Sequence, residues 1–164
     1  MLVEDWTDLA AIIAREKAAG KVVVTTNGVF DLPHVGHLRY LKQARALGDL
    51  LVIGLNSDAG TKRLKGQFRP IVPENERAEL LLGLSCVDFV TYFDETNPCE
   101  LLAILKPTIH TKGGDYDPET MPETPIVRAN GGEIVILPFV MGLSSTETIA
   151  RVIEMHDLEC KLKK

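Results

Sequence analysis

Short apolar runs alternate along the chain with stretches in which apolar residues recur at the spacing of a helix. Five runs rich in valine and isoleucine predict β-strands at 22–26, 50–55, 87–93, 108–111 and 133–137. Continuous apolarity, as in the run from Leu50 to Ile53, is typical of strands that are covered on both faces. The stretches between the strands predict helices at 6–19, 36–47, 74–84, 98–105, 125–130 and 146–156.

Strict alternation of strand and helix is typical of a parallel sheet with helices on both sides. The sequence therefore predicts a single α/β domain with a doubly wound, five-stranded, Rossmann-like parallel sheet. Gly20 and Gly48 follow the first two predicted helices, and each suits a left-handed C-cap. Residues 56–71 and 113–124 are predicted to be loops, and Lys161–Lys164 a solvated end.

Composition narrows the choice of partners. The 164 residues carry a net charge of −5, which argues against a general nucleic-acid binder, since such proteins usually present a basic face. A small anionic ligand in a local basic pocket is compatible with that charge. The three cysteines lack the spacing of a zinc or redox motif, and no apolar run approaches the ~20 residues needed to cross a bilayer. We therefore expect a cytoplasmic protein with reduced thiols that binds neither nucleic acid nor membrane.

The segment VFDLPHVGH at 29–37 contains two of the four histidines in the chain. It follows the first predicted strand, where doubly wound sheets bind ligands beside a helix N-terminus. Positions three apart on a first turn lie on one side, so His34 and His37 can both point at an anion bound there. Gly28 and Gly36 let the backbone approach that anion closely.

Two other interpretations of the histidine pair stay open. The pair could ligate zinc, but the sequence shows no third cysteine, histidine or carboxylate at ligand spacing, so we expect no metal site made by the protein alone. The pair could also be two hydrogen-bonded structural histidines, the usual explanation of an isolated HxxH. The position after the first strand and the flanking glycines favour a phosphate site over both.

The segment GVFDLPHVGH resembles the GxFDxxHxGH signature of the nucleotidyltransferase superfamily, which shares its HxGH element with class I aminoacyl-tRNA synthetases. Further motifs follow in order: LNSD, RLKG, RPI, CVDFV, LKPTIHTKGGDY and GGEIVILPFVMGLSST. Together they resemble the family of adenylyltransferase domains that make ADP-heptose from heptose 1-phosphate, over about residues 20–151. Many members of that family are fused to a sugar kinase, for which this chain has no room. The resemblance therefore implies the separate form.

The resemblance implies a fold of nucleotidyltransferase type and transfer of a nucleotide from a triphosphate, carried with Mg²⁺, to a sugar 1-phosphate. ATP is the expected triphosphate, a homodimer is the expected assembly, and the product is expected to supply lipopolysaccharide or another surface glycan. The implied catalytic residues are His34, His37, Lys65 and Lys112. The implied nucleotide-binding residues are Asn27, Gly28, Val29, Phe30, Gly36, His37, Lys112, Gly113, Ser144, Ser145 and Thr146. The implied sugar-phosphate residues are Asp31, Asn56, Asp58 and Asp115.

Several of these segments also have purely structural explanations. Phe30 could only pack in the core, and residues 56–58 and 112–116 could be ordinary turns. The basic segment 62–69 could be a solvated loop, or a flap that brings Lys65 to the phosphates.

The last predicted helix starts with a similar ambiguity. Ser144 and Glu147 fit a helix capping box, yet Ser145 and Thr146 could still face a phosphate at the same helix N-terminus. Arg77 could be a surface charge or an interface residue.

Two other functions stay open. The same chemistry could act on glycerol 3-phosphate, another phosphoalcohol or FMN. Residues 138–141 lack the arginine that related glycerol-phosphate cytidylyltransferases carry there, which favours the heptose family. The chain could also be a nucleotide-binding module without catalysis, although a binder alone does not need the full set of His34, His37, Lys112 and Thr146.

Overall fold

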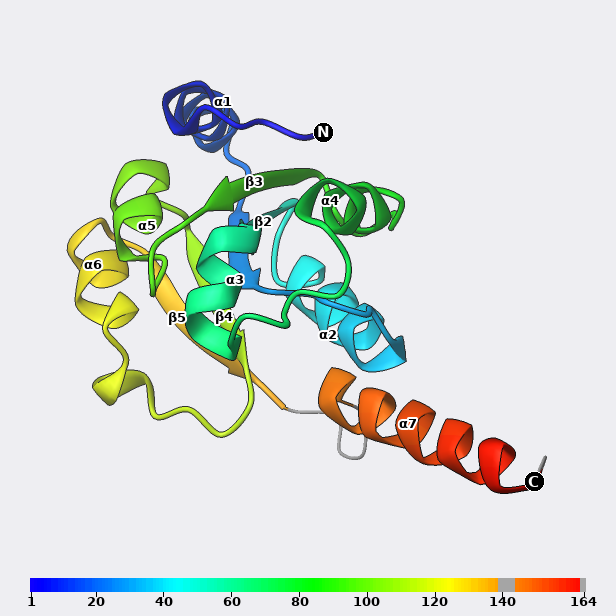
Figure 1. The fold of residues 1–164 in the computed structure, drawn as a ribbon. Helices are drawn as coiled ribbons and strands as arrows, with labels where there is room; N and C mark the ends of the chain where they lie inside the picture. The colour runs from blue at the N-terminus through cyan, green and yellow to red at the C-terminus, as the bar shows by residue number, and fades with distance from the viewer. Residues whose placement is uncertain (139–143, 163–164) are drawn as a thin grey trace.

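The computed structural model describes residues 1–138 and 144–162. Its centre is a five-stranded, fully parallel sheet in the order β3-β2-β1-β4-β5 (Figure 1). The strands are β1 (Val23–Gly28), β2 (Leu50–Asn56), β3 (Phe89–Phe93), β4 (Ile109–Gly113) and β5 (Glu133–Leu137). The predicted doubly wound α/β fold with five parallel strands is confirmed.

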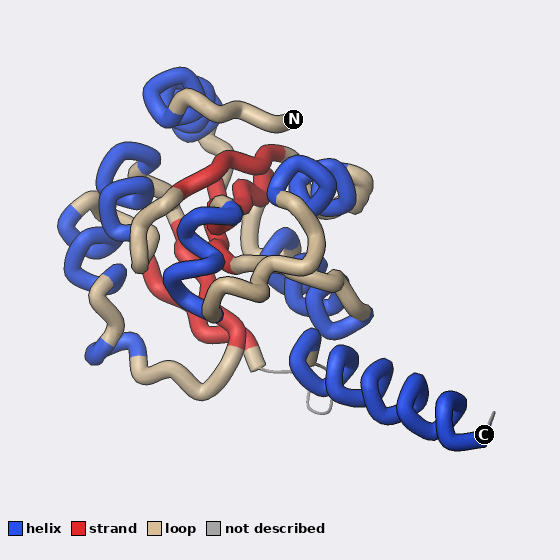
Figure 2. Tube along the Cα trace, viewed as in Figure 1, coloured by secondary structure: helices blue, strands red, loops and turns tan. Residues whose placement is uncertain are grey.

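Helices cover both faces of the sheet, which Figure 2 shows in red between blue helices. The helices are α1 (Trp6–Ala18), α2 (Val35–Arg45), α3 (Asp58–Lys65), α4 (Glu74–Leu82), α5 (Cys99–Leu105), α6 (Glu123–Ala129) and α7 (Ser145–Leu162), with a 3₁₀ turn η1 (Pro118–Thr120). Neighbouring residues of β1 point to opposite faces. Val24 packs in a core cluster that includes residues of α2 and α4, whereas Val23 packs with residues of α1 and α5.

Helix α7 differs from the others because it extends away from the sheet (Figure 1). It begins at the C-terminal edge of the sheet, and residues 150–161 along it are exposed. In the described ranges, 1–138 and 144–162, no helix combines the length and apolarity needed to cross a bilayer.

Helix α3 lies in a stretch that the sequence predicted to be a loop, so that prediction is wrong. The helix has only eight residues, and its interior glycine disfavours a helix. One local cap and one tertiary contact stabilise it. The Ser57 hydroxyl caps it by accepting a hydrogen bond from the Gly60 backbone N–H at 2.9 Å. A Cβ on Gly60 would lie 2.9 Å from the carbonyl oxygen of Asp94, so only glycine lets the helix pack this closely.

Strands β1 and β4 each continue two residues beyond their predicted ends. Asn27 and Gly28 pair with β2, and Lys112 and Gly113 pair with β5. The apolar pattern did not predict these residues, because polar side chains and glycine end each apolar run. The backbone pairing between strands nevertheless continues through them. The extension matters for function, because it places these four residues on the rigid edge of the sheet instead of in a loop.

The two predicted helix caps have different outcomes. Gly20 adopts a left-handed conformation with φ of 83°, as predicted. Gly48 does not, so its predicted cap is wrong. Its lack of a side chain serves packing, because a Cβ there would lie 2.6 Å from the carbonyl oxygen of Val22.

Candidate active site

A cleft of about 410 Å³ opens at the C-terminal edge of the sheet, at the ends of β1 and β4. The sheet continues from β1 to β2 and β3 on one side, and from β4 to β5 on the other. The cleft therefore lies at the topological switch point, where such sheets bind ligands. It is lined by Asn27, Gly28, Val29, His34, Gly36, His37, Tyr40, Asn56, Lys65, Lys112, Gly113, Tyr116, Pro138, Ser144, Ser145 and Thr146. All but Tyr40, Tyr116 and Pro138 belong to the predicted set of site residues.

The two histidines lie together at the start of α2. Their rings stack with centroids 3.9 Å apart. The backbone N–H of His34 donates to Nδ1 of His37 at 3.3 Å. Since a backbone N–H can only donate, Nδ1 of His37 is an acceptor, and the neutral ring carries its proton on Nε2. The prediction that both rings lie on one side of the helix start is confirmed, and His37 has a donor nitrogen available for an anion.

Burial, with the nearby charges of His34 and Lys65 acting in the same direction, lowers the pKa of His37 to about 4. The ring is therefore neutral at pH 7 and donates from Nε2 alone. A bound polyphosphate would oppose this effect, because its negative charge favours the protonated ring.

The loop between β1 and α2 has an unusual backbone. Phe30 and Leu32 adopt left-handed conformations with φ of 48° and 51°, although neither is a glycine. Such conformations cost on the order of 1 kcal/mol each and persist where the surrounding contacts impose them. The ring of Phe30 is buried edge-on against His37, with centroids 5.3 Å apart. This loop therefore fixes the orientation of the histidine pair.

Two lysines bring positive charge to the cleft. Lys65 ends α3, and burial together with the charge of Arg69 lowers the pKa of Lys65 although Asp31 opposes the shift. Lys112 ends β4, with its Nζ atom 3.1 Å from Oε1 of Glu123. Glu123 is buried and was missed by the sequence analysis, because the predicted helix began two residues after it.

The start of α7 provides the third part of the cleft. The hydroxyl of Ser144 accepts a hydrogen bond from the backbone N–H of Glu147 at 3.0 Å, as the capping spacing predicted. The hydroxyl of Ser145 donates to the carbonyl oxygen of Asp31, so it is engaged with the loop between β1 and α2. Thr146 lines the cleft beside them. Residues 139–141, where the missing arginine was noted, and 142–143 of the GLSST motif lie outside the described residues.

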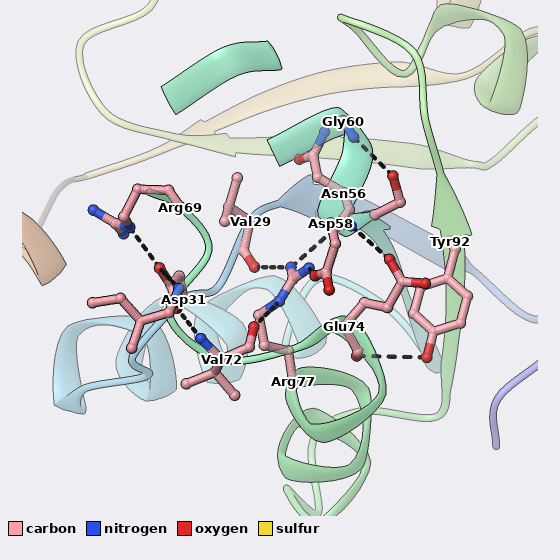
Figure 3. Close-up of polar contacts among 12 residues, drawn as sticks. Val29, Asp31, Asn56, Asp58, Gly60, Arg69, Val72, Glu74, Arg77 and Tyr92 are labelled. Atoms are coloured by element: carbon pink, nitrogen blue, oxygen red, sulfur yellow. Dashed lines mark hydrogen bonds and ion pairs between the residues drawn. The ribbon is translucent and has the colours of Figure 1, made fainter. Parts of the chain in front are cut away.

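Four predicted site residues do not line the cleft. Phe30 packs in the core cluster that includes α2. Asp115 is exposed, and its neighbour Tyr116 lines the cleft instead. The carboxylates of Asp31 and Asp58 are bound by protein groups: Asp31 by the segment that follows α3, and Asp58 by Arg77 at 2.8 Å (Figure 3). The binding roles assigned to these four residues stay predictions.

Arg77 is neither a surface charge nor an interface residue, since it is completely buried. Its guanidinium donates to three backbone carbonyl oxygens, those of Val29 at 2.6 Å, Asn56 at 2.9 Å and Val72 at 2.9 Å (Figure 3). Both sequence interpretations were wrong because a lone arginine on a short helix carries no signal of which backbone it will meet.

Tyr40 is the missed residue that the sequence could have revealed, because it lies three positions after His37 on the same side of α2. Its hydroxyl lies 2.6 Å from Oγ1 of Thr26 and donates to the carbonyl oxygen of Thr111 at 3.1 Å. Burial raises the pKa of Tyr40. The tyrosine therefore joins β1, β4 and α2 beneath the cleft.

Buried polar atoms without a partner occur at the cleft and also, among the described residues, at Thr61, Arg69, Thr91 and His110. In the described part of the chain, Oδ1 of Asn27 and Nδ1 of His34 are buried without a hydrogen-bond partner, and both residues line the cleft. Buried polar atoms of this kind cost free energy unless a ligand or water supplies a partner. Combined with two histidines, two lysines and a helix N-terminus, they suit a polyanion that also offers donors.

Comparison with known proteins gives a consistent result. Residues 25–151 match the family model described as cytidylyltransferase-like. The chain is similar to the bifunctional protein HldE of Pelobacter propionicus, with 53% identity over 148 residues, or 90% of this chain and 30% of the relative. HldE of Escherichia coli O157:H7 is 45% identical over 93% of this chain and 31% of its own length. The chain thus spans about 30% of the length of these curated relatives.

Solved structures add to this picture. The lipopolysaccharide core biosynthesis protein of Thermoplasma volcanium is 32% identical and has a TM-score of 0.59, covering 74% of this chain and 98% of that one. Pantothenate synthetase of Thermus thermophilus has a TM-score of 0.62 at 17% identity, over 90% of this chain and 66% of that one. The second likeness concerns the fold alone.

Proposed function

Because the chain belongs to the cytidylyltransferase-like family, we propose that it is a nucleotidyltransferase that acts on ATP and heptose 1-phosphate. The products are pyrophosphate and a nucleotide-activated heptose for lipopolysaccharide or another surface glycan. The observation that carries the proposal is the convergence of His34, His37, Lys65 and Lys112 on one cleft at the switch point of the sheet. The motif order and the similarity to HldE proteins support the choice of sugar.

The chemistry needs positioning and charge stabilisation more than proton transfer. An oxygen of the sugar 1-phosphate forms a bond to the α-phosphorus, and the bond from that phosphorus to the pyrophosphate oxygen breaks. The nucleophile is already an anion, so no general base is required. The barrier lies in bringing two anions together and in stabilising charge on the phosphoryl group and leaving group.

Each group of cleft residues has its own expected contact with the substrates. The Nε2–H of His37 donates to a phosphate oxygen, and His34 lies stacked beside it. Lys65 and Lys112 balance the charge of the triphosphate, and the α7 N-terminus adds backbone N–H groups and the Thr146 hydroxyl. Asn27 accepts from the nucleotide or sugar through its unpartnered Oδ1.

Mg²⁺ belongs to the proposal as a partner of the triphosphate. The lining residues include no carboxylate, and the described residues hold no cluster of three or more histidine, cysteine or acidic side chains. Such a site fits an ion whose ligands would be mostly phosphate oxygens and water. When bound, the ion neutralises charge on the transferred phosphoryl group and the leaving pyrophosphate.

Pyrophosphate release with a panel of triphosphates and sugar phosphates tests the proposal. We expect turnover with ATP and heptose 1-phosphate and its loss on removal of Mg²⁺ with EDTA. Turnover only with CTP and glycerol 3-phosphate would reassign the acceptor. Nucleotide binding by calorimetry without pyrophosphate formation for any pair would point to a module without catalysis and contradict the proposal.

We also propose that the chain forms a homodimer, on the basis of the family resemblance. Helix α7 offers apolar surface for such an assembly, since Val152, Ile153 and Leu158 on it are more than half exposed. Sedimentation equilibrium gives the mass of the particle, and a monomer at micromolar concentration would contradict this part.

A further inference from the structure

The carboxylate of Asp31 is almost completely buried, with 2% of the residue exposed, and it holds the segment that follows α3. It accepts from Nε of Arg69 at 2.6 Å and from the backbone N–H groups of Ile71 and Val72 at 3.0 Å each (Figure 3). Burial alone would raise the pKa of Asp31, but the hydrogen bonds from Ile71, Val72 and Arg69 outweigh it, and the pKa is lowered. The side chain therefore remains a carboxylate bound to protein donors.

This anchor lies close to Lys65 along the chain. Helix α3 ends at Lys65, Gly66 follows with φ of 94°, and the backbone N–H of Arg69 donates to the carbonyl oxygen of Gly66 at 3.1 Å. Lys65 and Arg69 thus lie at the two ends of one compact turn. The turn therefore couples the position of Arg69 to that of the lysine that lines the cleft.

Packing does little to hold the same turn. Residues 62–68 are exposed, and Phe68 is 84% exposed. A segment with so little buried surface relies on polar contacts for a fixed position. The contacts to Asp31 hold the turn on the side of Arg69, while Ser57 and Asp94 hold helix α3 on the side of Lys65.

At its other end, Asp31 belongs to the loop that carries the histidines. It lies between the two left-handed residues of that loop, and its carbonyl oxygen accepts from Ser145 at the start of α7. Arg77 holds the same loop through the carbonyl oxygen of Val29. The residue thus connects three segments that reach the cleft from separate parts of the sequence.

We infer that Asp31 is a positioning residue that fixes Lys65 relative to the histidine pair. This inference rests on the proposed nucleotidyl transfer and assigns Asp31 a role other than sugar binding. Both carboxylate oxygens are occupied by protein donors, and the side chain is not among the groups that line the cleft. An acid free to meet a phosphorylated sugar would also repel its phosphate, whereas this acid holds a basic turn.

A double-mutant cycle tests the connection to Lys65. Asp31→Asn keeps the size of the side chain and one oxygen that can accept from Ile71 and Val72. Arg69 then meets either the amide NH₂, which cannot accept its hydrogen bond, or a neutral oxygen, which accepts it more weakly than a carboxylate does. We expect kcat to fall ~10-fold or more, because small misplacements of catalytic groups are costly. In a Lys65→Met background the same substitution should cost less than about threefold, since the group that it positions is already absent.

The outcomes are distinct from those of the proposed function. Equal losses in both backgrounds would overturn the positioning role, and a selective rise in KM for the sugar phosphate would restore the sugar-binding role. Faster hydrogen exchange of the Val72 amide in Asp31→Asn, measured without substrate, is expected in addition, and unchanged exchange would count against the inference. Glu119→Gln, which removes an exposed ion pair to Arg128, is the matched control. No turnover by the wild-type chain would contradict the proposed function and leave the exchange measurement to decide the role of Asp31.

Discussion

Two polar clusters lie side by side at the C-terminal edge of the sheet, and they differ in how far their hydrogen bonds are satisfied. In the Arg77 cluster, the guanidinium meets the carbonyl oxygens of Val29, Asn56 and Val72 and the carboxylate of Asp58. In the cleft, by contrast, Asn27 and His34 hold buried polar atoms that have no partner within the described residues. One cluster is complete without a ligand, whereas the other is not.

This difference distinguishes polar groups that hold the fold together from polar groups that are available to bind a ligand. A buried polar group without a partner costs about 1–3 kcal/mol, and a ligand in the cleft would remove that cost for Asn27 and His34. A buried charged side chain whose hydrogen bonds are all made instead holds together the chain segments that supply its partners. Both clusters contain basic side chains, but the Arg77 cluster includes the Asp58 carboxylate, whereas no carboxylate lines the cleft.

Substitution in the Arg77 cluster should have the largest effect, and it should be on stability. Arg77→Met fills the space but leaves three carbonyl oxygens and the Asp58 carboxylate without their donor. Removing one partner from a buried, charged set costs about 3–5 kcal/mol, and we expect a loss of that size in the free energy of urea unfolding.

A surface arginine is the control for this substitution. Arg128→Met removes an exposed arginine paired with Glu119 and should change the free energy of unfolding by less than about 1 kcal/mol. If Arg77→Met were as stable as the wild type, the cluster would not be structural, and the comparison with the cleft would lose its basis.

Substitution in the cleft should have the reverse profile, with activity lost and stability kept. His37→Ala removes a donor aimed at charge that develops in the transition state, which typically costs ~10²-fold in kcat, or about 2.7 kcal/mol. The melting temperature should stay within a few degrees, because half-buried His37 contributes one long backbone hydrogen bond. Steady-state pyrophosphate release and thermal unfolding of one preparation give both values. A loss of less than tenfold would contradict the catalytic role.

The sequence predicted the cleft better than it predicted the Arg77 cluster. Glycines, histidines and the capping serine mark the cleft locally, so Gly28, His34 and Ser144 could be found from neighbours along the chain. The same local reasoning predicted the five parallel strands, because each apolar run carries its own signal.

Long-range contacts explain most of what the sequence did not reveal. Arg77 donates to carbonyl oxygens of residues that lie 48, 21 and 5 positions away in the sequence. Since every residue has a carbonyl oxygen, no sequence pattern predicts which ones an arginine will contact. Helix α3 depends on Gly60 packing beneath Asp94, and Glu123 is recognisable only by its nearness to Lys112. The positioning role inferred for Asp31 was hidden for the same reason, because its partners lie 38 to 41 positions away.

The pH dependence of the free energy of unfolding has the smallest expected effect, and it also tests the comparison between the two clusters. The Arg77 cluster contains no histidine, whereas burial lowers the pKa of His37 in the cleft to about 4. Burial also lowers the pKa of the fully buried His110, inside the sheet, to about 3. An unfolded histidine binds its proton near pH 6.5, so between about pH 6.5 and 4 the unfolded chain binds more protons than the folded one. Stability should therefore fall as the pH falls through that window and stay level above it.

Between pH 7 and pH 5 we expect the two histidines to contribute a loss of about 2–3 kcal/mol, with the share of His37 discounted for its partial exposure. Urea unfolding at the two pH values measures it. His37→Gln should remove the smaller part of the pH dependence, because the fully buried His110 contributes the larger part. Saturating ATP should reduce the part that belongs to His37, since the triphosphate favours the protonated ring, while the His110 part stays unchanged. A pH dependence that neither His37→Gln nor ATP alters would mean that the cleft histidine is as solvated as a surface residue, and the contrast between the two clusters would then rest on Asn27 and His34 alone.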